Sequence, residues 1–261
     1  MSHPFFAGAA HPRVFAHRGL VTPEASAGGI AENSFAAVAA AHAAGATYVE
    51  SDCHVTSDGE AVLFHDAGLE RITGDDRQLR DVTLRQLDAL MADRGGLITL
   101  AQALDAFPAT RFNLDVKADD AAAAVGRTVA AHAHRVLLTS FSDERRRVAL
   151  AAALRAGAEL SPATSPGTRT IAELLLATKV RSRRWVGRVL RGVDAVQIPP
   201  THNRVPVLSD RLIELVHGAG VEVHVWTVND VDAMRELVAR GVDGIVTDRV
   251  DLGLRALASP S

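Results

Sequence analysis

Residues 48–55 read Tyr-Val-Glu-Ser-Asp-Cys-His-Val and place two carboxylates inside a run with the composition of a buried strand. Successive residues of a strand point to opposite sides, so Glu50 and Asp52 share one face. Asp115 and Lys117, in Asp-Val-Lys, have the same spacing within a second apolar run. If the shared face is the inside of a barrel, these two charged strands converge there.

Similar short runs alternate along the chain with Ala/Leu-rich stretches of helical period, a pattern typical of repeated βα units around a parallel sheet. Eight strands are expected, near Val14–His17, Tyr48–Val55, Phe112–Val116, Val136–Ser140, Glu159–Pro162, Ala195–Ile198, Glu222–Trp226 and Gly244–Thr247. Helices are expected at Ser34–Ala44, Ala121–Ala133, Glu144–Ala156, Asp210–Ala219 and Val231–Arg240, with Ser34, Asp143, Ser209 and Asp230 as N-caps. The predicted fold class is α/β, a single TIM-like (β/α)8 barrel.

The length of 261 residues suits one barrel domain over residues 1–261, with its core at about 13–257. Residues 66–96 interrupt the repeat shortly after the second βα unit begins, with a turn-rich Thr-Gly-Asp-Asp stretch and one amphipathic helix. We expect a small insertion packed over the barrel mouth. The loop 20–31, rich in Ala, Gly and Ser, is expected to reshape that mouth.

Composition excludes several classes of protein. A net charge of -3 provides no general basic field for nucleic acid, which is therefore not an expected partner. Cys53 is the single cysteine and cannot form an intramolecular disulfide. The start Met-Ser-His-Pro-Phe-Phe lacks the features of a signal peptide, and no run approaches the ~20 apolar residues of a membrane span. We expect a cytoplasmic protein without stable membrane insertion; the oligomeric state stays open.

Basic charge clusters at Arg181–Arg191, a stretch in which Trp185 lies among five arginines. Peripheral contact with an anionic lipid surface is one interpretation of this pattern. A solvated arginine face on a barrel helix is the more ordinary one.

The acidic residues on the converging strands predict a metal site. Buried carboxylates cost several kcal/mol each unless a cation or hydrogen bonds compensate, and Lys117 offers one positive charge against three negative ones. One divalent cation held by Glu50, Asp52 and Asp115 would balance the set. All-oxygen ligation favours Mg²⁺ or Ca²⁺ over Zn²⁺. Ion pairs with Lys117 alone are the structural alternative.

Two histidines stand at strand ends, where barrel active sites form. His17 ends the first strand in His-Arg-Gly, and His65 follows the apolar run Ala-Val-Leu-Phe. Two such histidines can divide the roles of general acid and general base. Lys117, beside these acids, is one of only two lysines among 28 basic residues, so a lysine at this position calls for a reason.

These residues belong to eight blocks, in order between residues 13 and 251, that together resemble the glycerophosphodiester phosphodiesterases: His17-Arg18-Gly19, Glu32-Asn33-Ser34, Glu50-x-Asp52, Thr56-x-Asp58-Gly59, His65-Asp66, Asp115-x-Lys117, Trp226-Thr227-Val228-Asn229 and Gly241-Val242-Asp243-Gly244-Ile245-Val246-Thr247-Asp248. The resemblance implies a TIM barrel in which His17 and His65 act as acid and base and Glu50 and Asp52 bind the metal. It also implies that Trp226 lines the pocket and that Arg18 and Lys117 offset charge on the phosphate. Glu32 and Asn33 are first expected to cap and anchor a loop, and Asp248 to cap the last helix.

The implied reaction is metal-dependent hydrolysis of a small-molecule glycerophosphodiester to an alcohol and glycerol 3-phosphate. The third acid, Asp115, stands where many members of the family carry Glu, and an Asp-x-Lys block also resembles the sphingomyelinase D-like phospholipases. A lysophospholipase D activity is therefore the alternative. A second alternative, a barrel that binds phosphorylated ligands without chemistry, is disfavoured by the presence of both histidines and all the acids.

Overall fold

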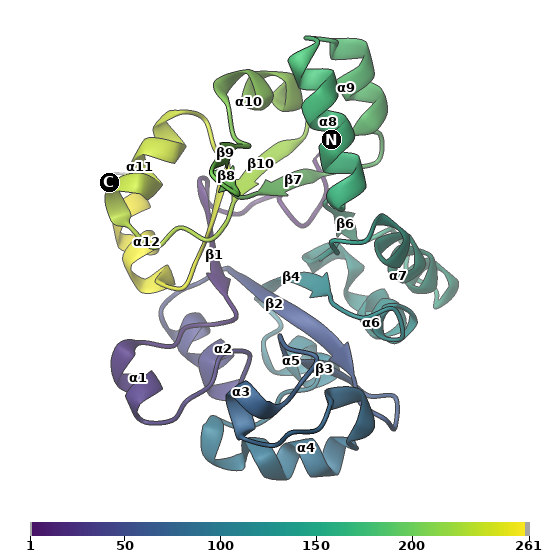
Figure 1. Ribbon diagram of the computed structural model, residues 1–261, viewed down its shortest axis with the longest axis vertical. Coiled ribbons are helices and arrows are strands. Elements are labelled where there is room, and N and C mark those ends of the chain that lie inside the picture. The colour runs from purple at the N-terminus through teal and green to yellow at the C-terminus, as the bar shows by residue number, and fades with distance from the viewer. Residues whose placement is uncertain (1, 259–261) are drawn as a thin grey trace.

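The computed structural model describes residues 2–258, so the outermost residues of the expected 1–261 domain lie outside it. Eight parallel strands follow one another around the molecule in the order β6-β5-β4-β2-β1-β11-β10-β7 (Figure 1). Their bounds are β1 Arg13–His17, β2 Tyr48–Val55, β4 Arg111–Val116, β5 Val136–Thr139, β6 Ala163–Thr164, β7 Ala195–Ile198, β10 Glu222–Val225 and β11 Gly244–Thr247. This nearly closed barrel confirms the predicted α/β fold.

The seam of the barrel lies between β6 and β7, the two ends of the strand order. Here the Asp194 amide donates to the Thr164 carbonyl, and the Thr164 amide donates to the Asp194 carboxylate, both at 2.9 Å. The strand expected at Glu159–Pro162 was placed too early: β6 begins at Ala163. Glu159 is exposed, and Pro162 has no N–H to donate to a ladder.

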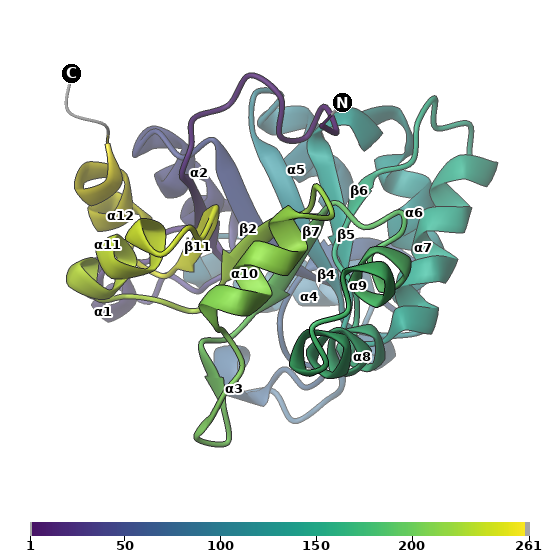
Figure 2. The same cartoon turned by 90° about the horizontal axis from the view of Figure 1, so that it is seen from above.

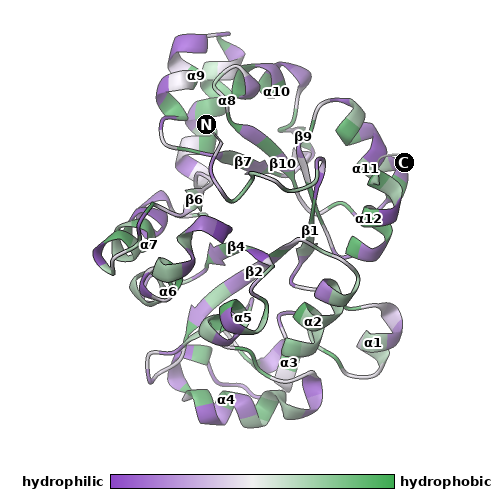
Figure 3. Ribbon diagram, turned by 180° about the vertical axis from the view of Figure 1, so that it is seen from behind, coloured by the Kyte–Doolittle hydropathy of each residue, from purple (hydrophilic) through white to green (hydrophobic). Residues whose placement is uncertain are grey.

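Helices surround the strands (Figures 1 and 2), and hydrophobic and hydrophilic residues alternate along them (Figure 3). The α-helices are α1 Pro23–Ala27, α2 Phe35–Ala43, α3 Glu70–Thr73, α4 Leu84–Met91, α5 Leu100–Ala106, α6 Ala121–Val129, α7 Asp143–Arg155, α8 Thr168–Lys179, α9 Arg183–Val189, α10 Asp210–His217, α11 Val231–Ala239 and α12 Val250–Leu257. Short 3-10 turns are η1 Leu79–Asp81, η2 Ala92–Arg94 and η3 Ala130–Arg135; short antiparallel strands are β3 Ala61–Leu63, β8 Thr201–His202 and β9 Val205–Pro206. Within residues 2–258 no helix has the length and apolar content needed to cross a bilayer.

Side-chain caps begin most of the predicted helices. Ser34, Ser209 and Asp230 each accept a backbone N–H in the first turn, which confirms them as N-caps. The prediction for Asp143 was wrong, because Ser142 caps α7 and Asp143 is its first residue. The Asp143 carboxylate instead accepts N–H groups at the start of α8, so it holds two neighbouring helices together.

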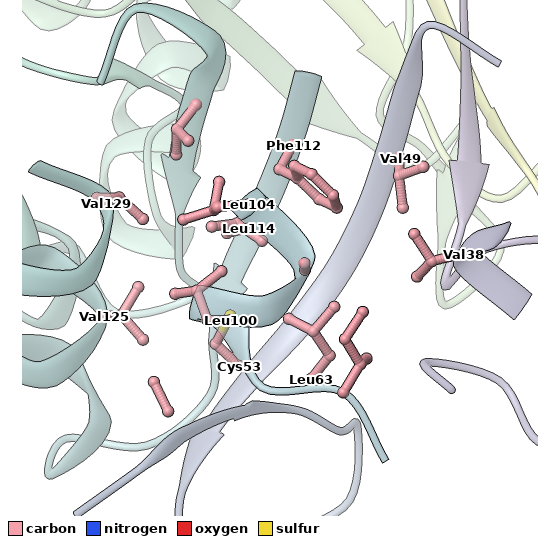
Figure 4. Close-up of a cluster of buried hydrophobic side chains, with 14 of the residues drawn as sticks. Val38, Val49, Cys53, Leu63, Leu100, Leu104, Phe112, Leu114, Val125 and Val129 are labelled. Atoms are coloured by element: carbon pink, nitrogen blue, oxygen red, sulfur yellow. The ribbon is translucent and has the colours of Figure 1, made fainter. Parts of the chain in front are cut away.

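The outer face of the strands packs against the helices and forms the larger part of the core (Figure 4). Val49 and Cys53 of β2 alternate with the inward-facing acids, and Phe112 and Leu114 do the same on β4. All four are completely buried. Burying these apolar faces at roughly 25 cal/mol per Å² fixes which side of each strand faces the barrel interior.

The N-terminal end of the barrel is sealed by a group that we call the floor, made of Phe5, Phe6, Arg13, Tyr48 and Glu222. Arg13 donates two hydrogen bonds of 2.7 Å to the Glu222 carboxylate and one of 3.0 Å to the Tyr48 hydroxyl. The Arg13 guanidinium also lies 4.8 Å from the centroid of the Phe6 ring. Figure 2 shows the N-terminal segment at the end of the barrel opposite α3.

Residues 66–96 form α3, α4 and two 3-10 turns beside β3. The expected amphipathic helix corresponds to α4, whose Leu87 and Met91 are buried in a small cluster with Val62. The Asp58 carboxylate accepts the Leu84 amide, so the Thr-x-Asp-Gly turn after β2 fixes the start of α4. This segment therefore has a core of its own that can hold its surface residues in place.

Candidate active site

A cavity of about 520 Å³ opens at the C-terminal ends of the strands, the end at which TIM barrels carry their active sites. It is lined by all eight side chains predicted as site residues: His17, Arg18, Glu50, Asp52, His65, Asp115, Lys117 and Trp226. They lie on β1, β2 and β4, directly after β1, β4 and β10, and in the segment after β3. The barrel therefore brings together residues spread over most of the chain.

Two cations hold Asp52 and Asp115. The Lys117 ammonium lies 2.8 Å from one oxygen of Asp52 and 2.7 Å from one oxygen of Asp115. The second oxygen of Asp52 lies 3.0 Å from Arg18 Nε and accepts a 3.1 Å hydrogen bond from Asn33. Burial raises the pKa of Asp52, but Lys117 and Arg18 outweigh it and leave the pKa lowered. Asp52 is thus a stable anion with both oxygens occupied.

Glu50 has a different environment. Among the described residues, His17 is the basic residue at ion-pair distance from Glu50. Its Nε2 lies 3.8 Å from Glu50 Oε2. Burial and the negative charge of Asp52 raise the pKa of Glu50 to about 8. A carboxylate this poorly compensated is a strong candidate for binding an added cation.

The donor atoms in the cavity fit a hard divalent cation. Glu50 Oε2, Asn113 Oδ1 and Asp115 Oδ1 are buried without a hydrogen-bond partner, and Glu50 and Asn113 are paired positions on β2 and β4. Unpartnered buried oxygens are costly, and Mg²⁺ and Ca²⁺ prefer such ligands. As they stand, no three His, Cys, Asp or Glu side chains within residues 2–258 surround one metal position. Lys117 lies between Asp52 and Asp115.

His17 is oriented by a partner from the other end of the chain. Its Nδ1 lies 2.6 Å from Asp248 Oδ1, and Asn229 donates a 2.7 Å hydrogen bond to the other oxygen of Asp248. Burial lowers the pKa of His17, but Asp248 and the charge of Glu50 outweigh it and leave the pKa raised. The expectation that Asp248 caps the last helix was wrong: Arg249 occupies that position and Asp248 holds the histidine.

His65 is held in the same way by its neighbour. Its Nδ1 lies 2.6 Å from Asp66 Oδ1, and Arg71 Nε donates to the other Asp66 oxygen at 2.5 Å. Burial raises the pKa of Asp66, but the bonds from Arg71 and His65 leave it lowered. Each histidine therefore turns its Nδ1 toward a carboxylate, which leaves Nε2 available to a ligand.

The turn after β1 places Arg18 at the edge of the cavity. Arg18 has φ 58°, and Gly19 has φ 86° with its α-carbon packed on α2. A β-carbon at Gly19 would lie 2.6 Å from the Ala37 backbone, so the His-Arg-Gly sequence needs glycine there. In the block Glu32-Asn33-Ser34, the helix cap is Ser34. Glu32 and Asn33 mainly contact site residues: Glu32 pairs with Arg18, and Asn33 donates a hydrogen bond to Asp52.

One side of the cavity is apolar, which the sequence did not indicate. Ile171 and Leu175 of α8 line it together with Phe141 and Val207. Phe141 is 60% exposed, and its ring centroid lies 6.0 Å from that of Trp226. The apolar residues of α8 have the spacing of any helix that packs on a sheet. The sequence therefore carries no signal that some of them face the cavity.

The basic stretch 181–191 forms α9 and its flanks, next to α8. Trp185 is partly buried against the core and donates a 2.8 Å hydrogen bond to Glu173, while Arg183 pairs with Glu214. These contacts account for Trp185 and Arg183 within the fold, and peripheral contact with a lipid surface stays a prediction.

Comparison with known proteins agrees with this geometry. The model of the Glycerophosphoryl diester phosphodiesterase family matches residues 17–252. Probable glycerophosphodiester phosphodiesterase 2 of Mycobacterium tuberculosis is 37% identical over 247 residues, which cover 91% of this chain and 87% of that protein. Lysophospholipase D GDPD1 of Rattus norvegicus is 31% identical over 122 residues, 41% of this chain and 37% of that one.

A solved structure has the same fold. It is a phosphodiesterase of Oleispira antarctica in complex with the product sn-glycerol-3-phosphate, with a TM-score of 0.71 and 22% identity over 95% of this chain and 98% of that one. The family-model match along the chain and the 37% identity together decide the family. The chain belongs to the glycerophosphoryl diester phosphodiesterase family.

Proposed function

We propose that this phosphodiesterase hydrolyses water-soluble glycerophosphodiesters to an alcohol and glycerol 3-phosphate, with His17 and His65 as acid and base. The observation that carries the proposal is the pairing of each histidine with its own aspartate at one cavity, at 2.6 Å in both cases. The bound product of the Oleispira antarctica phosphodiesterase supports this substrate class. The cytoplasmic location expected from the sequence stays a prediction.

The two histidines would move the protons of the reaction. With Nδ1 bound to a carboxylate, each imidazole can take or give a proton at Nε2. One histidine would remove a proton from water, or from the neighbouring glycerol hydroxyl, as that oxygen attacks phosphorus. The other would protonate the alkoxide of the leaving alcohol. Asp248 and Asp66 would keep the rings oriented through both transfers.

Arg18 and Lys117 would bind the phosphate. Both side chains line the cavity, and Lys117 is shared by Asp52 and Asp115. Negative charge that develops on the phosphoryl oxygens is stabilised by fixed cations in a site with little water. Trp226 would pack against the glycerol moiety beside them.

A divalent cation belongs to the proposal, as members of this family generally use one. Glu50 and Asp115, each with an unpartnered buried oxygen, would hold it with Asp52 beside them. When bound, Mg²⁺ or Ca²⁺ polarises a phosphoryl oxygen and offsets its charge. Ligand binding to the folded state raises stability by about 2.7 kcal/mol at a hundredfold excess over Kd, so thermal shifts with each ion would identify the metal.

A lysophospholipid is the second candidate substrate, because the cavity has an apolar side. Ile171 and Leu175 could lie along an acyl chain next to the phosphate-binding cations. The similarity to lysophospholipase D GDPD1 of Rattus norvegicus supports this reading over part of the chain.

A panel of substrates tests both candidates. Glycerophosphocholine, glycerophosphoethanolamine, glycerophosphoglycerol and lysophosphatidylcholine would each be assayed with Mg²⁺, with Ca²⁺ and with a chelator. We expect metal-dependent release of glycerol 3-phosphate from the three soluble diesters. Turnover confined to the lysolipid, and lost in Leu175→Ser, would establish the second candidate instead; no turnover on any of the four would reject both.

A further inference from the structure

We infer that Arg71, a residue of the segment 66–96, is a positioning residue that holds the two sides of the active site in register. The inference rests on the proposed roles of His65 and Arg18. Arg71 Nε donates to Asp66, the partner of His65, at 2.5 Å, and Arg71 Nη2 donates to Glu32 at 2.6 Å. The same Glu32 oxygen accepts a 2.9 Å hydrogen bond from Arg18.

One guanidinium therefore links two loops that are far apart in sequence. The forked donors of arginine can satisfy two carboxylates at fixed angles, which the single ammonium of lysine cannot do with the same geometry. Toward His65, Arg71 holds one oxygen of Asp66 and so keeps the other on the imidazole Nδ1. Toward Arg18, it shares the charge of Glu32, which leaves more of the Arg18 charge for a phosphate.

The helix that carries Arg71 is itself anchored. Leu69, just before α3, is completely buried in the cluster of the segment 66–96. Arg94 donates a 3.0 Å hydrogen bond to the Thr73 carbonyl at the end of α3. The Arg94 carbonyl also accepts the Ala31 amide, next to Glu32. The segment thus has a specific task at the mouth of the barrel, namely to present one arginine to both sides.

Arg71→Met tests this positioning directly. We expect kcat/KM on the best diester to fall by about 10- to 100-fold, as is usual when the outer partners of functional side chains are removed. The loss should divide between kcat, through His65, and KM, through Arg18. Arg71→Lys should recover part of the loss in KM and less of that in kcat. Arg77→Met is the matched control, because Arg77 lies in the same segment and its side chain pairs with Asp75.

A second measurement needs no turnover and therefore separates this inference from the proposed reaction. Nitrogen-15 NMR of histidine-labelled protein reports the tautomer of His65, whose signal is assigned by its loss in His65→Gln. We expect one tautomer, protonated at Nδ1, in the wild type and Arg77→Met, and a mixture in Arg71→Met with an unchanged circular dichroism spectrum. An unchanged tautomer in Arg71→Met, or a change in KM with none in kcat, would overturn the inference.

Discussion

Glu222 and Glu50 lie at opposite ends of the same barrel, and their environments shift the carboxyl pKa in opposite directions. At the floor, Arg13 meets Glu222 with two hydrogen bonds, and although burial opposes it the pKa of Glu222 falls to about 2. At the mouth, burial and the neighbouring Asp52 raise the pKa of Glu50 to about 8. The floor pairs its charge, whereas the mouth leaves one available for a ligand.

The comparison shows how one fold separates stability from function. Charges that are compensated away from the cavity, as at the floor, contribute to holding the structure together and are out of reach of a ligand. Charges that stay uncompensated cost stability until a substrate or cation arrives. Variants at the two ends should therefore affect different measurements.

The largest effect is expected at the mouth. His17→Ala and His65→Ala should each lower turnover by roughly 10²–10⁴-fold, because each removes a proton-transfer group. The unfolding midpoint in urea should stay close to that of the wild type, since both side chains are at the cavity surface. Near-normal turnover in either folded variant would remove that histidine from the mechanism.

A floor variant should show the reverse. Arg13→Met removes two hydrogen bonds from the partly buried Glu222 carboxylate and leaves it with His224, at 3.0 Å, as a partner. This should lower the free energy of unfolding by about 3 kcal/mol. The kcat of the folded enzyme at 25 °C should change little, as the floor is remote from the cavity. Urea denaturation and steady-state kinetics measure the two quantities. The double variant Arg13→Met/Glu222→Leu should recover much of the stability, and failure to do so would argue against a pairing effect.

Acid should weaken the floor specifically. Because the pKa of Glu222 is lowered from 4.5 to about 2 in the folded state, its ionised form stabilises the fold. That contribution is fully present above about pH 4.5 and is lost as the pH falls toward 2. The stability difference between the wild type and Glu222→Gln, measured in urea at several pH values, should therefore shrink over this range. A constant difference would contradict the linkage.

The smallest effect is expected at Glu50, whose contribution to stability should depend on pH in the opposite direction to that of Glu222. In chelator, the raised pKa of Glu50 means that the wild type loses stability as the pH rises from 4.5 through about 8. Glu50→Gln lacks this cost and should be more stable at pH 8 by about 1 kcal/mol, although inactive. Adding Mg²⁺ or Ca²⁺ should stabilise the wild type more than the variant. A destabilised variant in chelator would show that Glu50 is already compensated.

Much of this site could be predicted from residues close in sequence. The strand period placed Glu50 with Asp52 and Asp115 with Lys117, and the ladder between β2 and β4 brings the two pairs side by side. The apolar side of the cavity could not be predicted, because α8 turns part of an ordinary amphipathic face toward the mouth. The strand β6 was predicted a few residues too early, because the sequence of so short a segment does not show that burial begins only at Pro162.

The sequence alone determined which acids, bases and cations were candidates for the site and which way each faces along its strand, since side-chain type and the two-residue period are local properties. Only the tertiary structure decided what each of them meets. Asp248 lies 231 positions from His17 and reaches it because β11 pairs with β1. Arg71 reaches Glu32 because α3 packs beside the mouth. Hydrogen bonds this short require side-chain positions that only the assembled barrel fixes.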